Sequence, residues 1–230
     1  NRIVGNWASS YGGGLYGCAG PIHNNIIAGN RADLAGGGLH DCTQAISSNT
    51  IVGNRAGDRG GAISECPGTI SNNIIAMNEA SSAAAIYGPC SNTYNAYWRN
   101  LPGNFGPGVA SGLGDVSVQP LFIRDGRWDD NGTPQDAADD FWVDGDFHLR
   151  SRAGHWDAEA ARWVRDSSTS PCIDAGKPAA ARSGDLVAFL KQSLPLAVVA
   201  AGALAPLALG AGAGIVAGGT LAGLAVGAGW

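Results

Sequence analysis

A set of motifs that returns every 24 residues constrains the fold of this chain more than any other feature of its sequence. Asparagine and isoleucine mark the start of each copy, and a cysteine marks its later part. The defining columns are Asn1, Asn25, Asn49 and Asn73; Ile3, Ile27, Ile51 and Ile75; Asn6, Asn30, Asn54 and Asn78; and Cys18, Cys42, Cys66 and Cys90. The fourth copy reaches "AAAIY" at 83–87 one residue early and is back in step at Cys90. Such regular self-similarity indicates a solenoid.

The length and content of the repeat decide which solenoid it builds. A unit with two or three short strand-like runs cannot bury its own apolar side chains, but stacked copies can, because each strand pairs with its equivalent about 4.8 Å away. Helical repeats need about 33 to 47 residues and leucine-rich repeats need a leucine framework, and this unit has neither. We therefore expect an all-β parallel β-helix, with isoleucine columns inside, glycine columns at sharp turns and asparagine columns at bends.

The repeats also resemble a known family. "ISSNTIVGNRAGDRGGAIS" at 46–64 and "ISNNIIAMNEA" at 70–80 are similar to the right-handed parallel β-helix repeats of bacterial surface proteins, such as the pectin-lyase-like superfamily and the polymorphic outer-membrane proteins. The similarity is strong over residues 1 to about 96. Right-handed coils follow from this resemblance and from the usual handedness of parallel crossovers.

The chain divides into three regions. Residues 1–118 hold the repeats, and the opening "NRIVGN" lies inside a repeat unit, so we expect a piece of a longer precursor with further coils upstream. In residues 119–185, "QPLFI", "GDFHL" and "SPCIDAG" occur in the order seen in the closing segment of surface β-helix proteins. The resemblance implies a capping module and an exported product, since a solenoid must cover its last open edge.

Residues 186–230 are rich in alanine, glycine and leucine, and no charged residue occurs from Gln192 to Trp230. This run is longer than the roughly 20 residues that a membrane-spanning helix requires. Its glycines recur at a spacing of four, which lets membrane helices pack closely. We expect a helical membrane or sorting anchor with 207–226 as its core. The alternative is an apolar low-complexity tail or the translation of a shifted reading frame.

The cysteine column allows two interpretations. Equivalent cysteines on adjacent coils would have Cα atoms about 4.8 Å apart, within the range of a disulfide. Cys18 with Cys42 and Cys66 with Cys90 could therefore pair in an oxidising compartment. The interpretation that we favour is a reduced interior ladder of small apolar side chains.

One acidic segment and one set of aromatic residues are candidate binding sites. Residues 124–146 contain eight aspartates, whose oxygens are ligands that Ca²⁺ prefers, although the ordered spacing of an EF-hand loop is missing. The alternative is a solvated acidic loop. Aromatic rings on a solenoid face can stack on sugars, or they can pack coil ends and the cap. The predicted calcium ligands are Asp129, Asp130, Asn131, Asp136, Asp139 and Asp140, and the predicted carbohydrate-binding residues are Trp7, Tyr11, Tyr16 and Tyr87.

The net charge and the placement of the charged residues restrict the classes of function that we expect for this chain. The net charge of −5 and the presence of only two lysines argue against a nucleic-acid partner. Carboxylates in the repeats occupy different columns, so no catalytic set is evident. We expect a non-catalytic, exported or surface-displayed scaffold for adhesion or for contact with a polysaccharide or cell-surface glycan. The alternative is a polysaccharide lyase or glycoside hydrolase with its active face partly upstream, which a groove holding several carboxylates and a basic residue would favour.

Overall fold

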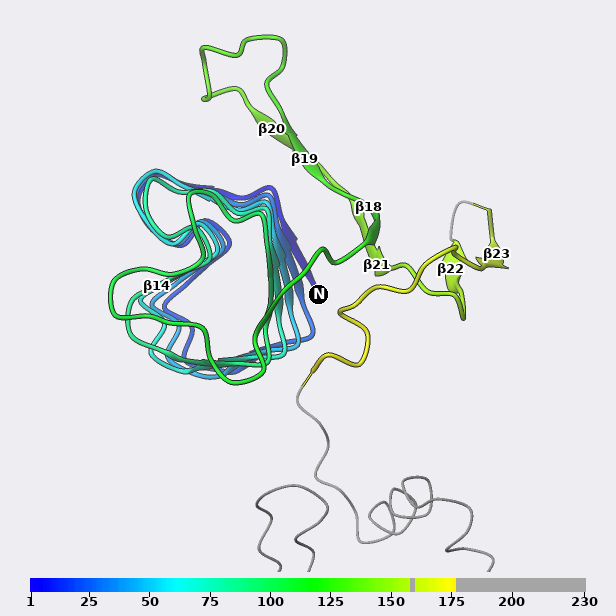
Figure 1. The fold of residues 1–230 in the computed structure, drawn as a ribbon. Helices are drawn as coiled ribbons and strands as arrows, with labels where there is room; N and C mark the ends of the chain where they lie inside the picture. The colour runs from blue at the N-terminus through cyan, green and yellow to red at the C-terminus, as the bar shows by residue number, and fades with distance from the viewer. Residues whose placement is uncertain (158–159, 177–230) are drawn as a thin grey trace, which may run out of the picture. The chain divides into compact units, whose positions relative to one another are not determined.

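The computed structural model describes residues 1–157 and 160–176, and this part of the chain is all-β, with a parallel solenoid up to residue 117. Figure 1 looks along the stack and shows successive coils lying over one another. The predicted helical tail at 186–230, its proposed membrane core at 207–226 and the end of the closing module at 177–185 lie outside the described residues. Within the described ranges there is no helix long and apolar enough to cross a membrane.

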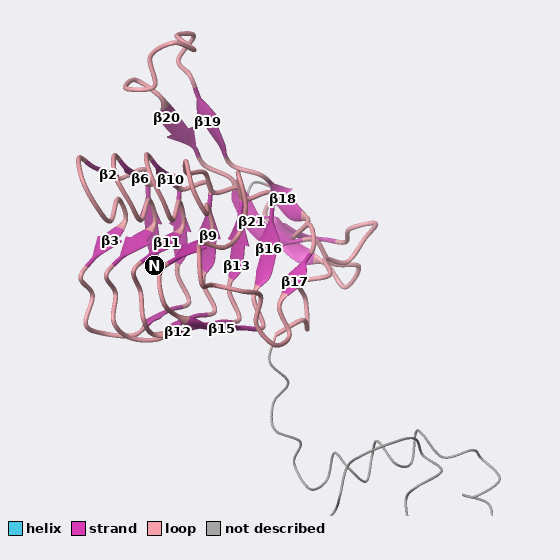
Figure 2. Ribbon diagram, turned by 60° about the vertical axis from the view of Figure 1, so that its left-hand side comes forward, coloured by secondary structure: helices cyan, strands magenta, loops and turns pink. Residues whose placement is uncertain are grey.

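Short strands of successive coils form four parallel sheets (Figure 2). A six-stranded sheet contains β1 (Arg2–Val4), β5 (Ile26–Ala28), β9 (Thr50–Val52), β13 (Ile74–Ala76), β16 (Ala96–Trp98) and β17 (Val116–Ser117), in that order. A three-stranded sheet contains β2 (Trp7–Ala8), β6 (Arg31–Ala32) and β10 (Arg55–Ala56). Two four-stranded sheets contain β3 (Leu15–Tyr16), β7 (Leu39–His40), β11 (Ile63–Ser64) and β14 (Ile86–Tyr87), and β4 (Ile22–His23), β8 (Ile46–Ser47), β12 (Thr69–Ser71) and β15 (Ser91–Thr93).

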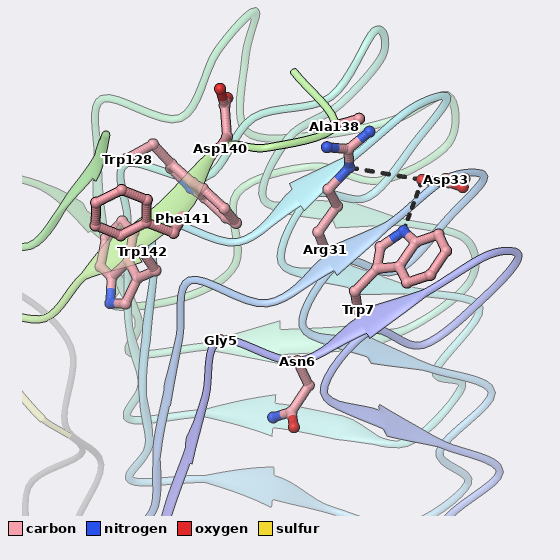
Figure 3. A pocket seen from close by; sticks show the side chains of 10 residues that line it. All are labelled: Gly5, Asn6, Trp7, Arg31, Asp33, Trp128, Ala138, Asp140, Phe141 and Trp142. Atoms are coloured by element: carbon pink, nitrogen blue, oxygen red, sulfur yellow. Dashed lines mark hydrogen bonds and ion pairs between the residues drawn. The ribbon is translucent and has the colours of Figure 1, made fainter. Parts of the chain in front are cut away.

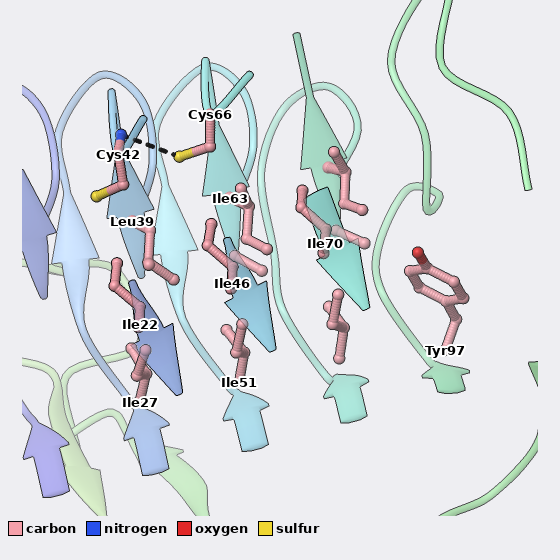
Figure 4. Packing of buried hydrophobic residues seen from close by; sticks show 14 residues of the cluster. Ile22, Ile27, Leu39, Cys42, Ile46, Ile51, Ile63, Cys66, Ile70 and Tyr97 are labelled. Carbon is pink, nitrogen blue, oxygen red and sulfur yellow. Dashed lines mark hydrogen bonds between the residues drawn. The ribbon is translucent and has the colours of Figure 1, made fainter. Parts of the chain in front are cut away.

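The register of these sheets confirms the predicted columns. Ile27 pairs with Ile3 on one side and with Ile51 on the other, and Ile51 pairs with Ile75. Their side chains meet those of the two four-stranded sheets in one interior cluster, where Ile27, Ile51 and Ile75 have no exposed surface (Figure 4). Burial of a complete isoleucine side chain contributes about 1.5–3 kcal/mol, so the stacked columns supply the main driving force for folding.

The asparagine columns form two hydrogen-bonded ladders at the bends. Asn54 shows the pattern: its Oδ1 accepts from the backbone N–H of Asn30 at 3.0 Å and from Asn30 Nδ2 at 2.9 Å. Its Nδ2 donates to the Ile27 carbonyl at 2.9 Å and to Asn78 Oδ1 at 3.0 Å. Each buried amide therefore satisfies backbone groups that a bend would otherwise leave without partners.

Aromatic residues close the interior at its C-terminal end. Tyr97 stands in the isoleucine column, above Ile75, and packs edge-on against Phe105 with ring centroids 4.9 Å apart. Phe105 pairs with Ile86 in an isolated bridge, and Val109 also packs against the interior cluster. Phe105 and Val109 therefore pack against the interior cluster at this end, and the capping role of the module at 119–185 stays a prediction.

The described residues of 122–164 contain three antiparallel strand pairs, formed by β18 (Phe122–Arg124) with β21 (Asp146–Leu149), β19 (Arg127–Asp129) with β20 (Phe141–Val143), and β22 (His155–Asp157) with β23 (Arg162–Val164). Phe122 and Phe147 are buried against Ala28, Val52 and Ala76 of the six-stranded sheet. This part of the module therefore packs along the outer side of the stack.

The four tryptophans of this region do not share one core. Trp128 and Trp142 pack edge to face, with ring centroids 5.7 Å apart, and Trp142 lies over the backbone of Gly29 and Gly53. Trp156 and Trp163 are opposite each other on β22 and β23 and are 53% and 61% exposed. The two tryptophan pairs are apart because the two hairpins that carry them are separate.

Candidate functional site

A charged column runs up the three-stranded sheet. Trp7, Arg31 and Arg55 are in register on β2, β6 and β10, and Glu79 follows in an isolated bridge. Arg55 Nε donates to Glu79 Oε2 at 2.9 Å. Asp33, two residues after Arg31, accepts from Trp7 Nε1 at 3.0 Å and lies 3.5 Å from Arg31 Nε. The four positions in register are one repeat period of 24 residues apart, which is why they share a column.

The β19–β20 hairpin reaches over this column. Arg55 Nη1 bonds Asp140 Oδ2 at 2.7 Å, and the guanidinium of Arg55 stacks on Trp128, 4.6 Å from the ring centroid. Arg31 donates to the carbonyl oxygen of Ala137. The Asp140 side chain is only 11% exposed, so its pairing with Arg55 is shielded from solvent more than a typical surface ion pair.

A cleft of about 510 Å³ opens between the column and the hairpin (Figure 3). Trp7, Arg31 and Asp33 line one side, and Trp128, Asp140 and Phe141 line the other. The rings of Trp7 and Phe141 remain 66% and 49% exposed. The hydrogen bond to Asp33 fixes the edge of the Trp7 indole and leaves its face available, so the cleft offers aromatic surface together with oriented polar groups.

The other three predicted sugar-contact residues lie elsewhere on the stack. Tyr16 and Tyr87 belong to the β3–β14 sheet, in a column with His40 and Ser64. Tyr11 and Tyr16 both stack on the His40 ring, at centroid distances of 4.7 and 5.6 Å. The structure therefore brings Tyr11 and Tyr16 together and keeps Trp7 in the separate hairpin cleft. Tyr87 is covered by a guanidinium, that of Arg59, at 4.9 Å.

Three polar residues lie beside these tyrosines; the sequence assigned no functional role to His40 and did not single out Arg59 and Ser64. His40 Nδ1, Arg59 Nε and Ser64 Oγ are buried and have no hydrogen-bond partner in the described part of the chain. Burial lowers the pKa of His40, a shift that Asp41 and Glu65 partly offset. The sequence signal for this arrangement is the size of the residues in two columns. In one coil the small Ala35 accompanies the large His40, and in the next coil the large Arg59 accompanies the small Ser64.

The predicted calcium ligands lie at the end of β19 and in the loop that joins it to β20. Asp139 accepts from the Thr133 hydroxyl at 2.7 Å, and the Asn131 amide donates to Asp139 at 3.4 Å. Asp129 accepts from Arg127 at 2.7 Å, and Asp140 pairs with Arg55. Asp136 accepts from the backbone N–H of Ala138 at 3.0 Å, and Asp130 from that of Gly132 at 3.0 Å.

No group of three or more histidine, cysteine or acidic side chains in residues 1–157 and 160–176 is arranged to hold a metal ion. Calcium binding by this loop stays a prediction.

The five cysteines are free thiols, in agreement with the reduced-ladder interpretation. The backbone N–H of Cys42 donates to Cys66 Sγ at 3.3 Å, and the two thiols donate to the carbonyl oxygens of His40 and Ser64 at 3.5 and 3.4 Å. Hydrogen bonding with the Cys66 side chain lowers the pKa of Cys42 from 9.0 to about 6, against the opposing effect of burial. The same hydrogen bond, with burial, raises the pKa of Cys66.

A second cavity, of about 390 Å³, lies beside the β18–β21 hairpin and contains two histidines. His148 Nδ1 lies 2.6 Å from Asp146 Oδ1, and His155 Nδ1 lies 3.0 Å from Asp166 Oδ2. Each histidine is thus oriented by a carboxylate. His148 is largely exposed and His155 is mostly buried.

Comparison of the chain with protein-family models, with curated proteins and with solved structures gives no match.

Proposed function

We propose that this chain is part of an exported, surface-displayed β-helix scaffold that contacts a glycan through the cleft between Trp7 and Phe141. The observation that supports this proposal most directly is the pair of exposed aromatic rings on opposite sides of a 510 Å³ cleft whose polar side chains are already held in place. Aromatic faces that flank oriented hydrogen-bonding groups are typical of small-molecule sites.

The resemblance of the repeats and of "SPCIDAG" to the pectin-lyase-like superfamily and to bacterial surface proteins supports export, adhesion and display outside the cell. The parallel stack of about five coils is compatible with that placement. An anchor at 207–226 would attach the scaffold to a membrane, and the acidic hairpin loop would take calcium in an extracellular medium. These remain parts of the proposal.

A second candidate is a polysaccharide lyase or glycoside hydrolase. The structure brings Asp33 and Glu79 of the repeats close to Asp140 of the hairpin through Arg31 and Arg55, which is the kind of charged groove that favours an enzyme. Each of these carboxylates is, however, engaged by an arginine, and a general acid must be able to hold a proton. We therefore rank glycan binding above catalysis.

The test is glycan binding by the full chain and by two tryptophan variants. Trp7→Ala removes a cleft ring, and Trp163→Ala removes an equally exposed indole of the β22–β23 hairpin. We expect Trp7→Ala to weaken binding about tenfold, equivalent to about 1.4 kcal/mol, and Trp163→Ala to bind like the parent. Equal affinity of the two variants would refute the cleft as the site, and release of new reducing ends would favour the enzyme.

A further inference from the structure

The arginines at the cleft are already neutralised by carboxylates of the chain. Arg31 lies beside Asp33 and donates to the Ala137 carbonyl. Arg55 is bonded on one side by Asp140, at 2.7 Å, and on the other by Glu79, at 2.9 Å. An incoming carboxylate would have to replace an internal acceptor that is held at the right distance by the fold.

The two cleft-lining carboxylates are balanced in the same way. Asp33 lies beside Arg31, and Asp140 shares Arg55 with Glu79, so each of these carboxylates is paired with a guanidinium group. Asp33 also accepts from the Trp7 indole at 3.0 Å. An ammonium group entering the cleft would therefore find no unpaired negative charge, and it would lose hydration in reaching the aromatic walls.

We propose that the glycan held between Trp7 and Phe141 is uncharged, and that the cleft discriminates against polymers of uronic acids and of amino sugars. This inference rests on the proposed function and specifies the ligand class of the same cleft. The apolar C–H face of a neutral sugar stacks on exposed aromatic rings, while its hydroxyls exchange hydrogen bonds with the paired side chains and need no net charge.

The test is affinity electrophoresis of the full chain in native gels that contain one polysaccharide at a time. The neutral probes are xylan, mannan and β-glucan, the acidic probe is polygalacturonate and the basic probe is chitosan. We expect retardation by at least one neutral polymer that does not change between low and high salt, since screening acts only on charge interactions. Polygalacturonate and chitosan should retard the chain at least tenfold less, compared as apparent dissociation constants.

A charge variant makes the test specific to the cleft. Asp140→Asn leaves Arg55 with one carboxylate fewer, so it should gain salt-sensitive retardation by polygalacturonate. Asp58→Asn is the matched control, because Asp58 pairs with Arg59 outside the cleft, at 3.2 Å, and its loss should change nothing.

The outcomes separate the two levels of the proposal. Parent binding to polygalacturonate or chitosan that is as tight as to any neutral polymer overturns the neutral-ligand inference and leaves glycan binding intact. Equal gains in Asp140→Asn and Asp58→Asn overturn the assignment of selectivity to the cleft charges. Absence of retardation by every polymer overturns the proposed function itself.

Discussion

At the scale of single residues, the columns were readable from the sequence because identical side chains repeat the same contact in every coil. Asn30, Asn54 and Asn78 are all fully buried, and each bonds both its neighbour in the ladder and a backbone carbonyl. A buried amide needs all of these partners at once, so the position tolerates few alternatives. Single residues outside the repeat, such as Asp140, gave no comparable signal of their partner.

Asn54→Ala should be among the most damaging single substitutions. It leaves the buried Asn30 N–H without its acceptor and removes one donor to the Ile27 carbonyl, and we expect a loss of about 3 kcal/mol in the free energy of unfolding. Urea denaturation measures this loss. Asn6→Ala is the control, because Asn6 is exposed at the end of the same ladder. Similar losses in both variants would mean that the ladder is not a source of stability.

Cys42 should make stability depend on pH. The pKa of its thiol is about 6 in the folded chain and near 9.0 in the unfolded chain. Between pH 6 and 9 the unfolded chain holds one more proton at Cys42 than the folded chain does. The free energy of unfolding therefore rises as the pH increases from about 6 to 9, and this stabilisation is lost as the pH falls back through that range to about 6. Cys42→Ser should remove this dependence, whereas Cys172→Ser, outside the ladder, should keep it. A Cys42→Ser profile parallel to that of the parent would contradict the assignment.

At the scale of elements, strands within the repeat were predictable and the hairpins were not. A strand such as β9 is specified by its equivalents on both sides, β5 and β13. The β19–β20 hairpin has no equivalent in another coil, and its position depends on where the Trp142 side chain can pack. Trp142 packs over Gly29 and Gly53, which have no Cβ to obstruct it, and the same column continues as Met77 in the next coil. The glycines indicated a turn, but nothing in the sequence connected Gly29 and Gly53 with a tryptophan 113 and 89 residues later.

The glycines beneath Trp142 give a matched test of the hairpin's position. Gly5 and Gly53 occupy the same column with φ of +68° and +64°, but a Cβ at Gly5 meets no atom within 4 Å, whereas at Gly53 it would overlap the Trp142 ring. Gly5→Ala should cost only the left-handed strain of about 1 kcal/mol. Gly53→Ala should cost about 2 kcal/mol more by overpacking. Urea denaturation followed by tryptophan fluorescence measures both, and equal costs would show that Trp142 does not rest there.

At the scale of the whole molecule, stability is a sum over coils and the interfaces between them. Each coil contacts chiefly its neighbours, so no single long-range contact defines the fold. This is why the period sufficed to predict the stack, while the side on which residues 122–149 pack depended on contacts that do not repeat.

Deletion of one whole period should therefore leave a folded protein. Removing residues 31–54 joins Asn30 to Arg55, which restores the Asn–Arg step of the deleted coil and keeps every column in register. We expect a cooperative transition in urea whose slope falls with the surface removed. Removing residues 31–42, half a period, moves every later side chain into the wrong column and should abolish that transition. Both deletions begin directly after Asn30, so they interrupt the chain at the same bend. If the two variants were unfolded to the same extent, the stack would be held by contacts other than the repeated ones.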